Sequence, residues 1–245
     1  MVCLMAQAKI RLFVEHGLGP GNSVPVGRDQ ANYLFNVMRL GVGDHVALFN
    51  GTDGEWLCEA VDTGKRRGML KCVSQSRPLQ MPPNLWLLFA PIKKARTDFI
   101  VEKATELGAS RIIPIVTDFT NSERIRQDRL QAHAVEAAEQ CGGTFVPEVA
   151  ELTKLSLLLD AWPSERHLMF CDEARVGPAE TLNGCTKGPW AVLIGPEGGF
   201  SDPERERLMA LPQTTAISLG PRILRADTAA VAALTLWQAT LGDWV

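Results

Sequence analysis

The spacing of apolar residues divides the chain into an N-terminal part with short strands and a longer part in which strands and helices alternate. In residues 1–76, short apolar runs separated by Gly-Pro, Asn-Gly and Asp-Thr-Gly turn signals predict four strands, at 10–14, 44–50, 55–61 and 68–73. Apolar side chains at helical spacing in Gln30–Arg39 predict a helix between the first two strands. We therefore expect a small β-barrel with one helix.

A domain boundary is predicted in Ser76–Asn84, which contains three prolines and no periodic apolar pattern. Residues 1–76 would form the barrel, and residues 77–245 a second domain. Beyond the boundary the pattern predicts strands at 85–90, 111–116 and 167–171, and helices at 96–107 and 127–141. This βαβα order is typical of an α/β domain whose parallel sheet is covered by helices on both faces.

Two strand–glycine loop–helix units follow near the C-terminus. Trp190–Phe200 reads WAVLIGPEGGF, and Leu219–Ala230 reads LGPRILRADTAA. A glycine loop after a strand is often only a turn, but two such loops close together would line a small-molecule pocket with backbone groups. Neither loop has the Lys and Ser/Thr of a phosphate-binding loop or the GxGxxG spacing of a dinucleotide site.

Helix-start signals accompany both units. Ser201 and Glu204 form a capping-box pattern with Pro203 in the first turn, so a helix should follow the first loop and end before Pro212. Asp227 or Thr228 is expected to cap the final helix, which is rich in Ala and Leu. Its apolar face needs a partner surface, either the core of the same chain or a second copy.

Charge and composition narrow the class of protein. The net charge is −3, but residues 1–130 hold 17 Lys/Arg against 13 Asp/Glu, and the remainder 8 against 15, so phosphate contacts are expected in the first part. Lys65–Arg67, at a hairpin tip, are either solvated turn charges or further phosphate contacts. No apolar run is long enough to span a membrane and no signal peptide is evident, which predicts a cytoplasmic protein. The cysteines lack CxxC spacing, so we expect reduced thiols and no metal site: Cys3, Cys58, Cys72, Cys141, Cys171 and Cys185.

At this point the motifs resemble a known family. GPEGG followed by LGxRILRxxTA is similar to the RsmE family of 16S ribosomal RNA uridine-N3 methyltransferases, in the SPOUT superfamily. Three further segments agree in collinear order: Leu34–Gly51, Lys94–Gly108 and Ala134–Val149. Gly143 departs from the pattern, since the family usually has arginine there, whereas the neighbouring Glu139 and Gln140 match.

The resemblance implies a knotted (trefoil) parallel-sheet methyltransferase domain preceded by a PUA-like RNA-binding barrel. It further implies S-adenosylmethionine as cofactor, N3 of a specific uridine of 16S rRNA in the small ribosomal subunit as target, and a homodimer with no membrane attachment. Two alternatives stay open: a related knotted methyltransferase acting on tRNA or on a ribose 2′-hydroxyl, and a non-catalytic RNA-binding or ribosome-assembly protein.

The family motifs also supply candidate binding residues. The cofactor-binding candidates are Leu193, Gly195, Glu197, Gly198, Gly199, Leu219, Gly220, Ile223 and Leu224. Phe170–Glu173, at the end of the preceding strand, is expected to form a third wall of that pocket. The RNA-binding candidates are Arg11, Arg39, Lys94, Arg96 and Arg222.

The chemistry points to Arg225 and Asp227 as catalytic candidates. The N3 proton of uracil is weakly acidic, so methylation requires its removal and stabilisation of the resulting anion, whereas a methyl sulfonium is already activated and needs no metal. Arg225 would stabilise the anion, although a salt bridge to Asp227 is a competing role. Asp227 stands where the family usually has Glu, and Glu197 is either a structural acceptor or the base. Deprotonation in solution without a protein base is a further option.

Overall fold

The chain is described by a computed structural model that covers residues 8, 10–121, 124–173, 182 and 184–245. It forms two compact units. Unit 1 comprises the chain up to Met81 together with Ala138–Val146, and unit 2 comprises Pro82–Ala137 and Pro147–Val245.

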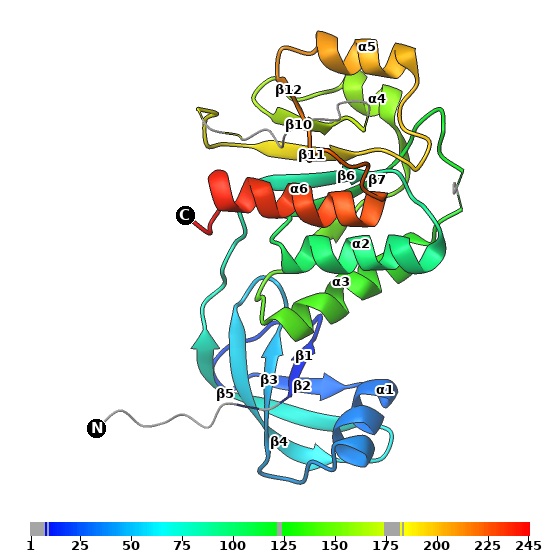
Figure 1. The fold of residues 1–245 in the computed structure, drawn as a ribbon. Helices are drawn as coiled ribbons and strands as arrows, with labels where there is room; N and C mark the ends of the chain where they lie inside the picture. The colour runs from blue at the N-terminus through cyan, green and yellow to red at the C-terminus, as the bar shows by residue number, and fades with distance from the viewer. Residues whose placement is uncertain (1–7, 9, 122–123, 174–181, 183) are drawn as a thin grey trace. The chain divides into compact units, whose positions relative to one another are not determined.

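Unit 1 is built on a five-stranded sheet in the order β1-β3-β4-β5-β2 (Figure 1). Its strands are β1 (Arg11–Phe13), β2 (Ser23–Val26), β3 (His45–Phe49), β4 (Glu55–Thr63) and β5 (Gly68–Arg77). The four predicted strands are confirmed. The strand β2 was not predicted, because its four residues include Pro25, which cannot donate a ladder hydrogen bond and is tolerated here at the edge of the sheet.

The predicted helix of unit 1 is confirmed, with a change of helix type. It begins as α1 (Arg28–Ala31) and continues as the π-helix η1 (Asn32–Val37), with Leu34 fully buried. Arg39 follows in the left-handed region, at φ 58°. A residue with a Cβ rarely adopts this conformation, so the chain reversal after η1 holds Arg39 under local strain while its side chain stays exposed.

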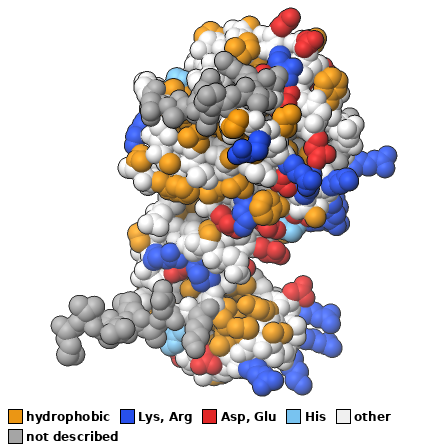
Figure 2. Space-filling view, viewed as in Figure 1, with side chains coloured by type: hydrophobic (Ala, Val, Ile, Leu, Met, Phe, Trp, Pro, Cys, Tyr) orange, Lys and Arg blue, Asp and Glu red, His pale blue; other side chains and the backbone are white. Residues whose placement is uncertain are grey.

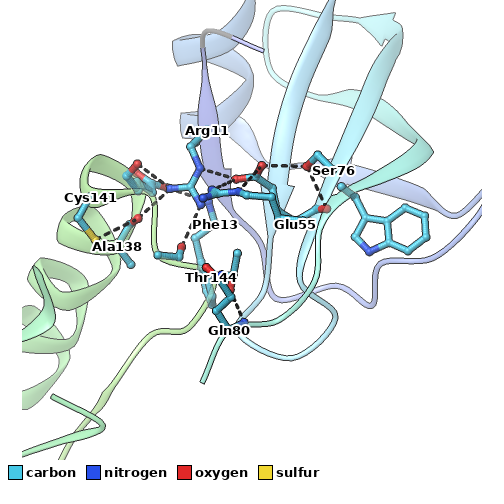
Figure 3. Close-up of polar contacts among 12 residues, drawn as sticks. Arg11, Phe13, Glu55, Ser76, Gln80, Ala138, Cys141 and Thr144 are labelled. Carbon is cyan, nitrogen blue, oxygen red and sulfur yellow. Dashed lines mark hydrogen bonds and ion pairs between the residues drawn. The ribbon is translucent and has the colours of Figure 1, made fainter. Parts of the chain in front are cut away.

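A polar cluster around Glu55 holds unit 1 together (Figure 3). Nε of Arg11 donates to Glu55 at 2.5 Å, Nη2 of Arg77 donates to it at 2.6 Å, and the Ser76 hydroxyl donates to it at 2.8 Å. Burial would raise the pKa of Glu55, but the hydrogen bonds from Arg77, Arg11 and Ser76 outweigh it and hold the pKa at about 2. Glu55 is therefore a fully charged, multiply bonded acceptor at neutral pH.

Arg11 also closes the C-terminal end of a helix. Its guanidinium donates to the carbonyl oxygens of Ala138 and Glu139, each at 2.8 Å, and of Gly143 at 2.9 Å. The first two belong to the last turn of that helix, whose carbonyls lack intrahelical partners, and a cation satisfies them well. Gly143, the position that departs from the family pattern, thus offers its backbone oxygen to Arg11 within the same unit.

Unit 2 carries the larger sheet, and the elements from Leu85 onward appear in an alternating order. In chain order they are β6 (Leu85–Phe89), α2 (Lys94–Glu106), β7 (Arg111–Val116), α3 (Gln127–Cys141), β8 (Glu148–Val149), β9 (Thr153–Lys154), α4 (Leu155–Asp160), β10 (His167–Cys171), β11 (Trp190–Ile194), α5 (Asp202–Ala210), β12 (Thr214–Ile217) and α6 (Ala226–Thr240). The sheet order is β12-β10-β11-β6-β7-β8, with β9 beside β7, and every pair is parallel. The predicted parallel α/β domain is confirmed.

Helices cover both faces of this sheet, with α4 and α5 on one face and α2 and α6 side by side on the other (Figure 1). Along β6, buried Leu88 belongs to the apolar cluster that includes Leu155 of α4 and Leu208 of α5. Its neighbours Leu87 and Phe89 alternate with it and are equally buried. A strand buried on both faces reads as a continuous apolar run, which is why β6, β10 and β11 were predicted closely.

Two helix starts test the capping predictions. The box at Ser201 is confirmed: its hydroxyl accepts from the backbone N–H of Glu204, whose carboxylate accepts from the backbone N–H of Ser201. The cap expected at Asp227 or Thr228 is wrong. Helix α6 begins at Ala226, with Arg225 as N-cap and no side-chain cap, so the N-cap lies two residues before Asp227 and the Asp227 carboxylate is available for another partner.

Three features expected from composition can be compared with the described residues. Among them, Cys58, Cys72 and Cys171 are buried free thiols, and Cys141 and Cys185 are free as well, while Cys3 lies outside the described part. No group of three or more His, Cys, Asp or Glu side chains in the described residues could hold a metal ion. No helix in that part of the chain is long and apolar enough to cross a membrane.

Candidate functional site

The two glycine loops meet at one edge of the larger sheet. The first follows β11 and the second follows β12, and β10 lies between these two strands. Because all three strands are parallel, their carboxyl ends fall on the same edge, where ligands bind in open α/β sheets. The prediction that the loops lie together is borne out by this strand order.

Two adjoining pockets occupy this edge and share part of their lining. The larger, of about 660 Å³, is lined by the first loop and the start of α6, and the smaller, of about 370 Å³, by the second loop. Five residues line both: Cys171, Glu173, Ile223, Leu224 and Ala229. The end of β10 thus contributes a wall, where Phe170–Glu173 was expected to do so. A single extended ligand can occupy the joined space.

Most of the cofactor-binding candidates line these pockets. Those that do are Gly195 and Glu197 of the first loop, and Leu219, Gly220, Ile223 and Leu224 of the second. Ile223 is 75% exposed, an unusual state for a large apolar side chain at a pocket mouth. Leu193 is an exception, since it is fully buried in the apolar core between the sheet, α4 and α5, and does not line either pocket.

The neighbouring glycines of the first loop have different roles. Gly199 has φ +72°, and a Cβ there would come within 1.9 Å of Oε1 of Glu173. That carboxylate in turn accepts from Nη2 of Arg205 at 2.5 Å, so little room exists for it to move. Gly198 has no such constraint, because a Cβ there would meet only the side chain of Phe119, at 3.3 Å. Neither residue is among those lining the two pockets, so Gly199 supports the loop from behind.

Arg96 connects the two loops. From the first turn of α2, its Nε and Nη2 donate to both carboxylate oxygens of Asp227, at 2.8 and 3.0 Å, and its Nη1 donates to Glu197. A bidentate guanidinium–carboxylate pair fixes both partners in one plane. The first glycine loop and the start of α6 are therefore tied to one side chain. Arg96, proposed from sequence as an RNA contact, has its guanidinium occupied by these two carboxylates.

The bridge changes the acid–base properties of Asp227. Hydrogen bonds from Arg96 lower the pKa of Asp227, and the backbone N–H of Thr228 adds to this effect by donating to the same carboxylate at 2.9 Å. In return, the two carboxylates raise the pKa of Arg96 further above its already high value. Asp227 is accordingly a weak proton acceptor.

Arg225 is left available by the same arrangement. The competing salt bridge to Asp227 does not form, because Arg96 occupies that carboxylate. Arg225 is exposed, lines the larger pocket, and its side chain makes no hydrogen bond or ion pair with any other described residue. A guanidinium without a protein partner at a pocket wall is suited to an anionic or developing-anionic ligand group.

The remaining RNA-binding candidates fall in different surroundings. Arg222 is exposed and lines the smaller pocket, and Arg39 is exposed in unit 1. Lys94 is exposed at the first position of α2. Arg11 departs from the expectation, because its side chain is only 16% exposed and its N–H groups are used by Glu55 and three backbone carbonyls. This geometry gives Arg11 a structural role.

The fold also alters the interpretation of the charge distribution. Residues 1–81 contain nine Lys/Arg against seven Asp/Glu, and residues 82–130 contain eight against six. The positive excess of the first 130 residues is therefore shared equally between the first unit and the start of the second. The sequence analysis attached this excess to residues 1–130 as a whole, whereas half of it lies in unit 2, on α2 and in the segment before α3.

Comparisons with known proteins agree with this architecture. A family model described as RNA methyltransferase domain matches residues 80–238, and one described as RNA methyltransferase PUA domain matches residues 26–68. The ribosomal RNA small subunit methyltransferase E of Rickettsia conorii is 31% identical over 229 residues, covering 91% of this chain and 93% of the relative.

Solved structures show the same fold. The ribosomal RNA small subunit methyltransferase E of Neisseria gonorrhoeae, bound to S-adenosylmethionine, superposes with a TM-score of 0.86 at 26% identity, over 96% of this chain and 99% of that one. A methyltransferase of Legionella pneumophila in complex with the same cofactor also reaches 0.86, at 27% identity, over 96% and 98%.

A parallel sheet whose strand ends carry two glycine loops around one pocket, combined with an N-terminal PUA domain, defines an RNA methyltransferase of the SPOUT class. The match to the RNA methyltransferase domain model covers well over half of the chain, and the Rickettsia relative is similar along nearly its whole length. The chain belongs to the ribosomal RNA small subunit methyltransferase E family, RsmE.

Proposed function

We propose that this protein uses S-adenosylmethionine to methylate N3 of one uridine of 16S ribosomal RNA, the position numbered 1498, in the small ribosomal subunit. The observation that carries the proposal is the pocket at the ends of β10, β11 and β12, whose wall includes Arg225, a guanidinium with no partner among the described residues. Membership of the family supports the RNA substrate, and the cofactor-bound relatives support the methyl donor.

The pocket residues fit S-adenosylmethionine. At Gly220, φ is +117° and a Cβ would meet nothing within 4 Å, so the backbone there faces open space that a ligand can approach closely. Leu219, Ile223 and Leu224 supply apolar walls for an adenine ring, and Glu173 lines both pockets.

Arg225 acts on the uracil in this proposal. When bound, S-adenosylmethionine supplies a methyl group on a sulfonium, which is already activated for transfer. The protein must align the uracil N3 with that methyl group and stabilise the negative charge that develops on the ring as the N3 proton leaves. Arg225 donates a charge-assisted hydrogen bond to a uracil carbonyl oxygen, an interaction that strengthens as the charge grows.

Asp227 and Glu197 serve as positioning residues. Both oxygens of Asp227 accept from Arg96, and this lowers the pKa of Asp227 well away from that of uracil N3. We therefore revise the sequence-based assignment of Asp227 as a catalytic group. The bridge holds the start of α6 in place, and it keeps Asp227 from neutralising Arg225 by pairing with it.

The other expected properties of the family form part of the same proposal. The N-terminal PUA-like domain, residues 1–76 as predicted from sequence, binds RNA with Arg39 among its contacts, and the methyltransferase domain from residue 77 contributes Arg222. The protein acts as a homodimer in the cytoplasm, where its ribosomal substrate would be found.

Mass mapping of 16S rRNA tests the function directly. Small subunits from a strain that lacks the gene are incubated with the purified protein and labelled cofactor, and the RNA is digested and mapped. We expect a single added methyl group at N3 of the target uridine. Methylation of tRNA or of a ribose 2′-hydroxyl would support the first alternative, and cofactor binding too weak to detect would support a non-catalytic RNA-binding protein.

A further inference from the structure

A basic groove in unit 2 lies outside the pocket described above. It has a volume of about 730 Å³ and is lined by Lys94 of α2 and by three arginines at and before the start of α3, namely Arg124, Arg126 and Arg129. Thr97 and Ile92 form part of its wall. Figure 2 shows Lys and Arg side chains gathered in this region of the unit, beside the segment that joins β7 to α3.

The groove carries more positive charge than the described residues neutralise. Arg126 pairs with Asp128 at 2.6 Å, and Arg129 pairs with Asp98 at 2.7 Å. Lys94 and Arg124 are exposed and have no ion pair or side-chain hydrogen bond with any other residue that the structure describes. Two of the four cations are thus free, and they face the same groove from two different elements.

The N-terminus of α2 also carries an excess of positive charge. A helix N-terminus carries a partial positive charge and normally attracts acidic residues. The first turn of α2 contains no acidic residue and its N-cap, Lys93, makes no side-chain cap, while Lys94 and Arg96 follow. Glu197 and Asp227 neutralise Arg96, but no described carboxylate does so for Lys93 or Lys94. Lysines beside the positive end of a helix repel it, and such an unfavourable arrangement is expected where a bound anion compensates the charge.

The position of the groove indicates which anion it takes. Lys94 and Thr97 line it, and Arg96, in the same first turn of α2, contacts the two carboxylates of the methyl-transfer site. Because Lys94, Arg96 and Thr97 belong to the first turn of α2, the groove lies within about one helix diameter of Arg96, roughly 10–12 Å. A strand whose target base occupies the pocket would bring neighbouring phosphates within reach of the groove.

From these observations we propose that the groove formed by Lys94, Arg124, Arg126 and Arg129 binds the phosphodiester backbone of the substrate RNA next to the methylated nucleotide. This inference rests on the proposed function, since it takes RNA as the substrate. It assigns a second RNA contact to the catalytic unit itself, in addition to the N-terminal domain. Phosphate contacts of this kind fix the register of the nucleic acid without reading its sequence.

The test compares two doubly substituted full-length proteins that lose the same charge. One carries Lys94→Gln and Arg124→Gln. The matched control carries Lys103→Gln and Lys187→Gln, two exposed or half-exposed lysines of unit 2 outside the groove. Binding of each to 16S rRNA is titrated over a range of salt concentrations, and circular dichroism and cofactor affinity verify the fold.

We expect the groove variant to bind the RNA on the order of tenfold more weakly, with a salt slope smaller by roughly 1.5 because two phosphate contacts are lost. The control should stay close to wild type in both quantities. Equal affinities and slopes for the two variants would overturn the proposal.

A further binding measurement, with small phosphate compounds in place of RNA, distinguishes an RNA-binding groove from a general anion site. If inorganic phosphate or uridine monophosphate bound the groove as tightly as the RNA, as judged by loss of that binding in the groove variant, a small-anion site would replace the RNA proposal. Failure of the proposed methylation is distinguishable, because in that case wild-type protein would transfer no methyl group to the target uridine while the binding difference between the two variants persisted.

Discussion

The guanidinium of Arg96 donates two hydrogen bonds to the carboxylate of Asp227, of 2.8 and 3.0 Å, although 131 positions separate the two residues in the chain. The same guanidinium reaches Glu197 of the first glycine loop. These hydrogen bonds determine which charged side chains of the site are paired within the protein. Asp227 is neutralised by Arg96, and Arg225 at the adjoining pocket wall keeps its charge for a ligand.

The first prediction concerns Asp227. Asp227→Asn keeps the shape of the side chain and removes the charge, so we expect turnover to fall about tenfold through a less ordered start of α6, an effect typical of a positioning contact. Arg96 lowers the pKa of Asp227 below its ordinary value, so the carboxyl group is ionised throughout the neutral pH range. The pH dependence of turnover between about pH 6 and 9 should be unchanged in the variant.

The matched change in this test is Arg96→Met, alone and combined with Asp227→Asn. Because the two side chains act as a pair, the combined loss in turnover should be smaller than the product of the separate losses. A fall of a thousandfold or more in Asp227→Asn, with loss of one limb of the pH profile, would identify Asp227 as the base and contradict the positioning role.

The second prediction concerns Arg225. Arg225→Ala should lower turnover on the order of a hundredfold or more, as loss of a donor to a developing oxyanion does, with cofactor affinity nearly unchanged. Arg225→Lys keeps the charge without the planar fork and should rescue only part of the activity. Single-turnover methylation of purified small subunits and cofactor titration measure the two effects separately.

Arg222→Ala provides the comparison for Arg225, because Arg222 lies in the same loop and is proposed to bind RNA. It should raise the RNA concentration needed for half-maximal rate and leave the saturated rate almost intact. The assignment of Arg225 fails if its Ala variant retains near-normal turnover, or if cofactor affinity collapses together with activity.

The third prediction distinguishes two neighbouring glycines. Gly199→Ala introduces a Cβ at φ +72°, 1.9 Å from Glu173, and should weaken cofactor binding about tenfold or more by displacing a carboxylate of the pocket wall. Gly198→Ala meets only Phe119, at 3.3 Å, and should change the affinity less than about threefold. Calorimetric titration of both folded variants decides between them, and the reverse order of effects would show that the loop is shaped differently.

The fourth prediction is a pH dependence of stability. The pKa of Glu55 is about 2 in the folded state against an ordinary value of 4.5, so its ion pairs with Arg77 and Arg11 stabilise the fold fully above about pH 4.5. That contribution is lost progressively as the pH falls from 4.5 towards 2. Glu55→Gln should lower the free energy of unfolding at neutral pH by about 3 kcal/mol and flatten its dependence over this acid range.

Glu59→Gln is the control, since Glu59 lies on the same strand, is half-buried, and forms no ion pair with another described residue. Its effect on the free energy of unfolding should be within about 0.5 kcal/mol. Urea unfolding at several pH values measures both variants. If wild-type and Glu55→Gln proteins lost stability in parallel below pH 4.5, another carboxylate would have to account for the acid sensitivity.

Local patterns were sufficient for most of the fold. The strands β7 and β10 and the helix α3 have the predicted bounds, because a buried strand and an amphipathic helix each leave a strong periodic signal in a few residues. The short elements β8, β9 and α4 were missed, since two- to six-residue segments carry too little periodicity to stand out from loops. The trefoil knot that the family resemblance implies stays a prediction.

The candidate site was predicted in its composition but not in its internal connections. The two glycine loops, the capping box at Ser201 and the motif that ends in Arg225 could be predicted, because each of them consists of nearby residues in the chain. The positions of Leu193 in the core and of the Gly199 Cβ against Glu173, and the pairing of Arg96 with Asp227, became apparent in the folded structure alone. The physical reason is that hydrogen bonds and steric contacts depend on which side chains the folded sheet brings within a few ångströms, and those residues lie far apart along the chain.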